Sequence, residues 1–503
     1  MILPGAAKLC VEELEQKNIC HQCIGEGYLS DAVESAGTMG KCDYCGDDEE
    51  PTVPLVQVAD RVEAVFNDHF ERTPAEPNWY KEQLLKDKEI EFSWWREGQP
   101  TIDAIEEIAG VGLDVARDLQ KILNDRHASY DEYWEEAEFD EDAHYWDTPA
   151  DYSDVWGQWR AFEKELKTET RYFSPHAAEF LKMIFADLAT LKTRDGKSLV
   201  IEAGPDTEVD EFYRARHFET ESSLIRAMKA PDRELGPPPS KLASAGRMNS
   251  RGVSVFYGAN VPDAALAEVR PPVGSQVFVA KFRLKRNVRL LDLSSLPLIG
   301  IAGSYFDPEF LPLLKRTKFL GDLAAIMSMP VMPNDADLEY LPTQVISDYL
   351  SAATDTPLDG ILFPSVQTDV REEEEGEGEI PKFVNVVLFN KSSRVTRIDH
   401  PEEAVIDAST WQMYNEGPDP EYRVSVQVPE SEESGAVEVD VTKTPFELAL
   451  EMQEVPIDLD ERLETLEVDV NSLSVHVVKG VRILAASHDV SWSQYTEPNI
   501  SDF

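Results

Sequence analysis

The stretch GRMNSRGVSVFYGA, residues 246–259, decides how the chain is interpreted. Two arginines, an asparagine and a tyrosine stand on a glycine-punctuated turn that leads into an apolar strand. The chain as a whole is strongly acidic, with a formal net charge of −49. A basic, polar loop beside a strand of so acidic a protein predicts a binding site for an anionic ligand.

The region around this loop carries the opposite charge to the rest of the chain. Residues 210–290 hold fourteen Lys and Arg against eight Asp and Glu, a local balance of +6. Arginines at strand ends and in Gly-rich turns suit forked contacts with phosphate oxygens. The alternative is that this basic region docks on the acidic helical part of the same chain.

The totals exclude several classes of protein. A chain of 503 residues with 42% hydrophobic content is expected to form three or four domains with real cores. An excess of 96 acidic over 47 basic residues repels nucleic acid and anionic membranes. No apolar run approaches the roughly 20 residues of a membrane span, and the N-terminus lacks a secretory signal. We therefore predict a cytoplasmic protein with no membrane or nucleic-acid partner.

Four of the five cysteines form two close pairs near the N-terminus. The pairs CHQC (20–23) and CDYC (42–45) are separated by eighteen residues, which is the two-knuckle spacing of a structural zinc site. Each turn directs two thiolates to one point, so Cys20, Cys23, Cys42 and Cys45 are predicted to bind Zn²⁺. A redox pair or plain reduced thiols are the alternatives. Cys10 is left over, and His21 is a less favoured ligand.

Residues 51–195 show helical periodicity and predict a helical domain. The acidic, aromatic segment 130–154 is predicted to be a long loop whose aromatic rings pack on these helices. Arg171 and His176 in RYFSPH match the short motif of the HEPN ribonucleases. Pro175 interrupts the helix that both side chains should share, so a helix-end arginine and a capping histidine are the favoured interpretation.

Six segments in the second half of the chain resemble the RES domain family in sequence and order. The region before them, a cysteine module followed by helices, looks like the HEPN/RES N-terminal domain that is fused to RES domains. The six motifs are FYRARH (212–217), GRMNSRGVSVFYGA (246–259), ALAEV (265–269), YLPTQVISDYL (340–350), LDGILFPSV (358–366) and NVVLFN (385–390).

This resemblance implies an ADP-ribosyltransferase-like fold with a cleft for NAD. It also implies a toxin of a toxin–antitoxin pair that breaks the nicotinamide–ribose bond by hydrolysis, phosphorolysis or transfer of ADP-ribose. No Gly-rich dinucleotide fingerprint follows a strand, so NAD is expected to be a substrate and not a hydride carrier.

The resemblance also implies a role for individual residues. Glu268 is expected to face the ribose, where a carboxylate stabilises an oxocarbenium-like sugar; a water-exposed glutamate on a strand edge is the alternative. Arg214 is expected to hold the pyrophosphate, with Arg216 as the competing candidate. The remaining expected contacts to NAD are Arg247, Asn249, Tyr257, Ser365 and Asn385.

The sequence departs from the family pattern in three places. Met248 stands where the family usually has an aromatic residue, which weakens stacking there. Residues 220–244 form a long insert before the arginine turn. A second insert at 371–379 carries six acidic residues and is predicted to be a solvated excursion.

The predicted fold class is a multidomain α+β protein. We place a zinc module at 1–50, a helical domain at 51–195, a RES domain at 196–395 and a small β-rich extension at 396–503. The predicted function is NAD cleavage by a toxin or defence effector. An ADP-ribosyltransferase, a scaffold with an inactive pocket and a HEPN-like ribonuclease are the alternatives. NAD, a protein antitoxin or regulator, and a second copy of the chain are the expected partners.

Overall fold

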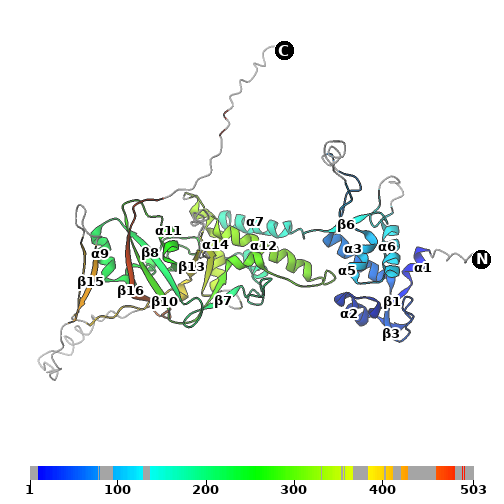
Figure 1. The fold of residues 1–503 in the computed structure, drawn as a ribbon, viewed down its shortest axis with the longest axis horizontal. Helices are drawn as coiled ribbons and strands as arrows, with labels where there is room; N and C mark the ends of the chain where they lie inside the picture. Colours follow the sequence, from blue (N-terminus) through cyan, green and yellow to red (C-terminus); the bar gives the residue numbers. More distant parts are fainter. Residues whose placement is uncertain are drawn as a thin grey trace, which may run out of the picture. The chain divides into compact units, whose positions relative to one another are not determined.

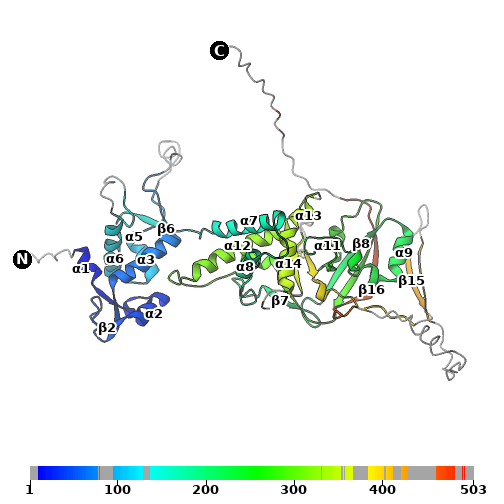
Figure 2. The same cartoon turned by 180° about the vertical axis from the view of Figure 1, so that it is seen from behind.

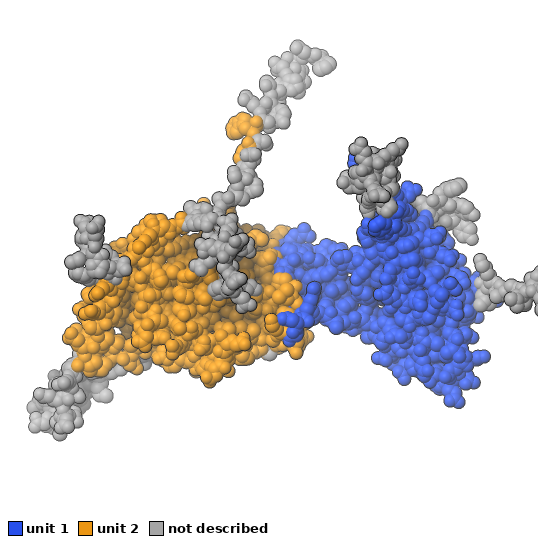
Figure 3. All heavy atoms as spheres, viewed as in Figure 1, with its two compact units in different colours: residues 1–161, 194–196, 299–322 blue, residues 162–193, 197–298, 323–503 orange. Residues whose placement is uncertain are grey.

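The computed structural model describes most of the chain. The described residues are 10–77, 79, 94–128, 136–329, 331, 332, 334–352, 355, 357–365, 383–401, 404–411, 421–428, 460–481, 490 and 492. They divide into two compact units, which are coloured separately in Figure 3. Unit 1 comprises residues 1–161, 194–196 and 299–322, and unit 2 comprises 162–193, 197–298 and 323–503.

Unit 1 combines helices with two small sheets. Its short N-terminal sheet has the order β1-β3-β2 and its second sheet the order β4-β6-β5. The helices are α1 (Val11–Glu15), η1 (His21–Cys23), α2 (Gly27–Ala36), α3 (Leu55–His69), α5 (Thr101–Ala109) and α6 (Leu113–His127). The strands are β1 (Asn18–Cys20), β2 (Thr38–Gly40), β3 (Glu50–Pro54), β4 (Phe70–Arg72), β5 (Gln99–Pro100) and β6 (His144–Asp147).

The helices predicted in residues 51–127 are confirmed, with one break. In α3, the residues at helical spacing, including Leu55, Val62 and Phe66, are fully or almost fully buried, as expected for one apolar face. The pattern over 101–123 forms two helices because Gly110 adopts φ 61° and ends α5. The three-residue connection 110–112 then leads directly into α6.

The aromatic segment after α6 packs as predicted where the structure describes it. Phe139 and Tyr145 are buried beside Phe66, with ring centroids 5.1 and 4.8 Å from its ring. The prediction of a loop is wrong for β6, which holds Tyr145 by pairing with both β4 and β5. Residues 129–135, which include Tyr130, Tyr133 and Trp134, lie outside the described part.

Two long helices run across the division between the units. They are α7 (Ser153–Thr168) and α12 (Phe310–Ser328). In unit 2, α8 (Pro175–Ile184) starts with Pro175 in its first turn, and Ser174 Oγ accepts a hydrogen bond from the Ala177 N–H. The cap is therefore Ser174, and the predicted capping role of His176 is wrong. Arg171 lies in the connection between α7 and α8, so it shares no helix with His176.

Unit 2 is built on one eight-stranded sheet with the order β16-β10-β8-β9-β13-β12-β11-β7. Its pairs are antiparallel except β11 with β12, which are parallel. The strands are β7 (Val200–Ala203), β8 (Glu211–Phe218), β9 (Phe256–Ala259), β10 (Gln276–Leu284), β11 (Val288–Asp292), β12 (Gly360–Pro364), β13 (Val384–Leu388) and β16 (Leu466–Val477).

Helices and short segments surround this sheet. On one face, Phe212, Phe256 and Phe282 anchor the main core. On the opposite face, Ala215, Ala259 and Val279 pack under α11. The helices are α9 (Glu221–Lys229), α10 (Pro231–Glu234), η2 (Ser240–Leu242), α11 (Pro262–Glu268), η3 (Leu293–Leu298), α13 (Ala336–Glu339), α14 (Leu341–Ala352) and η4 (Asn390–Ser392).

Two regions outside the six RES-like motifs are part of this architecture, the insert 220–244 and the C-terminal extension. The insert 220–244 forms α9, α10 and η2, and Leu224 and Leu235 from it are buried in the main core. The C-terminal extension supplies β16, which pairs along β10 and forms one edge of the sheet (Figures 1 and 2). A separate hairpin is formed by β14 (Val405–Trp411) and β15 (Glu421–Gln427). The acidic insert 371–379 and residues 429–459 of the C-terminal extension lie outside the described residues.

Candidate active site and metal centre

The large sheet has a partial opening between two of its central strands. β8 and β9 are paired at a single register position, Tyr213 with Ala259. β8 pairs on its other side with β10 along its whole length, and β9 pairs with β13. The strand residues next to the single pairing, Arg214 and Gly258, both line a pocket. The incomplete ladder thus positions the site.

This pocket has a volume of about 170 Å³. Its sheet side includes Tyr257, Phe363 and Asn385, and its helix side includes Glu268 and Val269. A side chain at Gly258 would bring Cβ within 2.7 Å of the Phe256 ring, so glycine is required at this wall. Rings and small apolar groups thus surround a few polar groups, which is typical of a small-molecule site.

Glu268 and Asn385 are directly connected in the pocket. Glu268 is the last residue of α11 and is exposed, and its Oε2 accepts a hydrogen bond of 3.1 Å from Asn385 Nδ2. The strand position considered from the sequence is therefore wrong for Glu268. Asn385 is only 3% exposed, and its Oδ1 is buried without a hydrogen-bond partner among the described residues. The Asn385 amide therefore fixes the Glu268 carboxylate, and its own Oδ1 remains available to accept a hydrogen bond from a ligand.

Arg214 of β8 also lines this pocket. Its Cζ lies 5.1 Å from the centroid of the Phe256 ring, and burial lowers the pKa of Arg214 to about 10. The guanidinium therefore stays charged at neutral pH. Its Nη1 is buried and makes no hydrogen bond to any described residue. A buried charged donor without a partner destabilises the fold. An anionic ligand, or one with a hydrogen-bond acceptor, would satisfy the Nη1 donor.

Neighbouring basic residues of the same sheet differ from Arg214 in having acidic partners. Lys281 pairs with Glu211 at 2.8 Å, and Arg283 pairs with Asp469 at 2.8 Å. Arg216, the competing candidate, donates to Glu234 O at 3.0 Å and does not line the pocket. Much of the basic region seen in the sequence is thus used by ion pairs within the fold.

Tyr257 connects the pocket to the GRMN loop. Its hydroxyl donates to Asn249 Oδ1 at 2.9 Å and accepts from the Met248 N–H at 3.1 Å. Burial raises the pKa of Tyr257, so the phenol stays protonated. Asn249 Nδ2 donates to the backbone oxygens of Ser244 and Val253. Asn249 thus fixes the loop, and Tyr257 presents its ring to the pocket.

Arg247 was expected to contact NAD, but its side chain binds backbone oxygens of the same chain. Its Nη1 donates to Met327 O at 3.0 Å and to Met329 O at 2.5 Å, and it does not line the pocket. Thr343 and Gln344 of α14 hold the same loop through hydrogen bonds to its backbone oxygens. Buried Met248 accepts a hydrogen bond from Ser347. The loop is therefore fixed by α14, by the last turn of α12 and by Met329 just after it.

Ser365 lies one residue beyond β12, and its N–H donates to Phe383 O at 3.0 Å. The pocket lining includes Phe363 from the same strand, but not Ser365.

Of the eight predicted active-site residues, the structure brings Arg214, Tyr257, Glu268 and Asn385 into one pocket. Sequence reasoning missed the apolar lining residues Phe363, Ala265 and Val269. Their apolar types carry no functional signal in one sequence.

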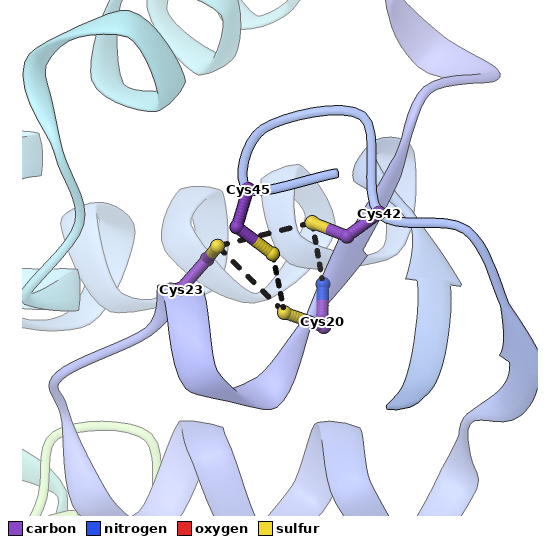
Figure 4. A group of neighbouring side chains, drawn as sticks. All are labelled: Cys20, Cys23, Cys42 and Cys45. Atoms are coloured by element: carbon purple, nitrogen blue, oxygen red, sulfur yellow. Dashed lines mark hydrogen bonds between the residues drawn. The ribbon is translucent and has the colours of Figure 1, made fainter. Parts of the chain in front are cut away.

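The four paired cysteines converge in unit 1, as Figure 4 shows. The Sγ atoms of Cys20 and Cys23 are 3.7 Å apart, those of Cys20 and Cys45 are 3.6 Å apart, and those of Cys23 and Cys42 are 3.8 Å apart. Four sulfurs around one zinc ion at about 2.3 Å would be roughly 3.8 Å apart. The four cysteines could therefore hold one metal ion with no open position.

The thiols of the cluster differ in their pKa values, and burial raises those of Cys20 and Cys23. Burial raises the pKa of the Cys42 thiol, but hydrogen bonds from backbone N–H groups outweigh this effect and lower it to about 7. The thiolate is the form that binds metal. His21 Nδ1 lies 3.7 Å from Glu50 Oε2 and is not part of the cluster. Cys10 is exposed and also lies outside it.

Comparisons with known proteins now place these features in a family. A model of the RES domain matches residues 212–412. The chain therefore contains a RES domain. A model of HEPN/RES N-terminal domain 1 matches residues 35–180. No curated protein and no solved structure matches the chain.

The RES match includes the pocket and the loop that Tyr257 holds. RES domains are commonly NAD-related components of toxins, so a general NAD-related role follows for this RES domain. The matched ranges overlap the helical and RES domains predicted from sequence, whose boundaries stay predictions. In the described part of the chain, no helix is long and apolar enough to cross a membrane.

Proposed function

We propose that the RES domain cleaves NAD at the bond between nicotinamide and ribose. The single observation that supports this most directly is the chemistry of one pocket. A positively charged Arg214 with a buried donor, the carboxylate of Glu268 and the acceptor of Asn385 line the same cavity. NAD offers the matching groups, since it carries an anionic diphosphate and a hydroxyl-bearing ribose next to a flat, cationic ring.

The cavity is sized for one end of this substrate. Its volume of about 170 Å³ is below the roughly 300–1,000 Å³ of sites that enclose a drug-sized ligand. The nicotinamide riboside end would occupy the pocket, where the Tyr257 and Phe363 rings offer apolar surface to a flat ring. The diphosphate would lie toward Arg214, and the adenosine half would lie outside.

In the reaction, the C–N bond between the ribose C1′ and nicotinamide breaks. Its electron pair leaves with nicotinamide and neutralises the ring nitrogen, while the ribose gains oxocarbenium character. Glu268 stabilises this developing positive charge, and Asn385 holds the carboxylate in place. Water or phosphate then forms the new bond at C1′ and gives up a proton to solvent.

The experiment is an incubation of the purified chain with NAD, with and without phosphate. Release of nicotinamide with ADP-ribose indicates hydrolysis, and a phosphorylated ADP-ribose indicates phosphorolysis. Attachment of ADP-ribose to protein or nucleic acid would assign the chain to the transferases. Intact NAD after prolonged incubation would favour a scaffold with an inactive pocket.

We further infer that Zn²⁺ is the metal of the four-cysteine cluster and that its role is structural. A cluster of four thiolates satisfies the tetrahedral preference of zinc and leaves no position for a substrate. Reduced thiols at such a site are typical of a reducing compartment, which fits action in the cytoplasm. As a toxin or defence effector, the chain would be controlled by a protein antitoxin or regulator.

A further inference from the structure

Unit 1 contains a second pocket, which the proposed function does not use. Its volume is about 520 Å³, within the range of sites that bind small molecules and side chains. β4, β5, β6 and α5 contribute to its lining, as does the segment 303–306. All of these residues belong to unit 1, so the pocket is a property of that unit alone.

Aromatic rings form a large part of its walls. Trp146 is 40% exposed and lines the pocket together with Phe70, Tyr145 and Tyr305. Tyr305 is held in place, because its ring stacks on His69 with centroids 4.3 Å apart. Exposed faces of Trp and Tyr attract organic cations, and several such rings around one cavity strengthen this attraction.

The polar part of the lining is acidic and contains no Lys, Arg or His. Glu107 and Asp147 are exposed at the pocket, and Glu26 is half-buried. Asp147 Oδ2 accepts a hydrogen bond of 3.0 Å from the Tyr305 hydroxyl. Burial, together with Asp147, raises the pKa of Tyr305 to about 12, so this phenol adds no charge at neutral pH.

The carboxylates at this pocket differ from Asp118 and Glu63 of the same unit, which form ion pairs. Asp118 pairs with Lys17 at 2.7 Å, and Glu63 pairs with Arg126 at 2.5 Å. Glu26, Glu107 and Asp147 have hydrogen-bond donors but no ion-pair partner among the residues that the structure describes. A cavity with aromatic walls and unpaired carboxylates is therefore complementary to a cation with an apolar stem.

We propose that this pocket binds an arginine or lysine side chain of a partner polypeptide. The aromatic rings would receive the aliphatic stem and the face of the cationic group. Glu107 and Asp147, which are exposed, would neutralise its charge. Because these acids remain open to solvent, the backbone of the partner can stay outside while one side chain enters.

The test is a calorimetric titration of the full-length protein with a capped pentapeptide that has one central arginine. The same peptide with citrulline, a neutral analogue of arginine, serves as the ligand control. We expect the arginine peptide to bind, with an affinity that falls as salt is added. Trp146→Ala should weaken binding by roughly two- to thirty-fold, the range of a cation–π contact. Glu107→Gln and Asp147→Asn should weaken it as well.

Glu141→Gln is the matched protein control, because Glu141 is an exposed acid of unit 1 that does not line the pocket. It should leave the affinity unchanged. Equal binding of both peptides, no binding of either at millimolar concentration, or full binding by Trp146→Ala would overturn the proposal. Binding of free agmatine without binding of the peptide would also overturn it. The readout is independent of NAD cleavage, so its failure leaves the proposed reaction untouched.

Discussion

Asn385 donates a hydrogen bond from Nδ2 to Glu268 Oε2 over 3.1 Å, which connects strand β13 to the end of helix α11. The donor is almost fully buried and the acceptor is exposed. The hydrogen bond thereby fixes an exposed glutamate to the sheet. The same amide presents Oδ1 as a buried acceptor without a partner among the described residues, so one residue positions the carboxylate and can also contact the ligand.

Replacing this amide with a second carboxylate should therefore impair catalysis. In Asn385→Asp, two carboxylates would share one site, which raises the pKa of one of them and removes the donor to Glu268. A hydrogen bond to a charged group contributes about 1.5–3 kcal/mol, so kcat/KM for NAD should fall roughly 10- to 150-fold. Activity should recover partly at lower pH. A variant with unchanged kinetics would show that the bond has no catalytic role.

Replacing Arg214 should affect the stability of the protein and its binding of NAD in different ways. Its buried Nη1 lacks a partner among the described residues, so Arg214→Met should keep or raise the melting temperature of the ligand-free protein. The same variant should lose the rise in melting temperature that NAD produces in the wild type. Arg216→Gln is the control, since Arg216 lies outside the pocket. Retention of the NAD effect in Arg214→Met would contradict the assigned role.

Removing metal should destabilise the N-terminal unit. The four sulfurs form a closed site, and a structural metal contributes its binding free energy to folding. We expect about one zinc per chain by elemental analysis, and a lower melting temperature after chelation. Cys42→Ser should reproduce the loss, whereas Cys10→Ser should not, because Cys10 lies outside the cluster. A metal-free protein of unchanged stability would refute the structural role.

The ion pair between Arg96 and Glu136 predicts part of the acid sensitivity of unit 1. Hydrogen bonds from Arg96 lower the pKa of Glu136 below its usual value. The pair therefore stabilises the fold above the ordinary pKa of a glutamate, and this contribution is lost as pH falls through the lowered value. Glu136→Gln should be less stable than the wild type at neutral pH, and the difference in melting temperature should shrink in acid. A difference that is constant with pH would rule this out.

The parts of the architecture that depend on residues close together in the chain were predictable from the sequence. The cysteine cluster followed from two local turns, and the helix α3 followed from its apolar periodicity. The end of α5 depends on the left-handed backbone of Gly110, which the apolar pattern does not reveal. The pairing of β16 with β10 joins strands that are far apart in the chain, and local pattern does not specify such a partner.

In the candidate site too, some features were predictable from the sequence, whereas others depend on segments that are distant in the chain. Family resemblance selected Arg214, Tyr257, Glu268 and Asn385, and the fold brings them into one pocket. It did not reveal that the Arg247 guanidinium binds carbonyl oxygens 80 and 82 positions further along the chain. The direction of a long side chain depends on acceptors supplied by distant segments. The apolar lining residue Phe363 gave no signal, because its type is common in any buried strand.

The most direct test of the central claim is the release of nicotinamide from NAD by the wild type and by Glu268→Gln, measured beside melting curves. Glu208→Gln is the matched control, because Glu208 is exposed and does not line the pocket. We predict that the wild type and Glu208→Gln release nicotinamide at similar rates. Glu268→Gln should retain its fold and lose at least about 100-fold in rate, a loss comparable to that of one preorganised electrostatic contact. Equal release by Glu268→Gln and the wild type would contradict the account.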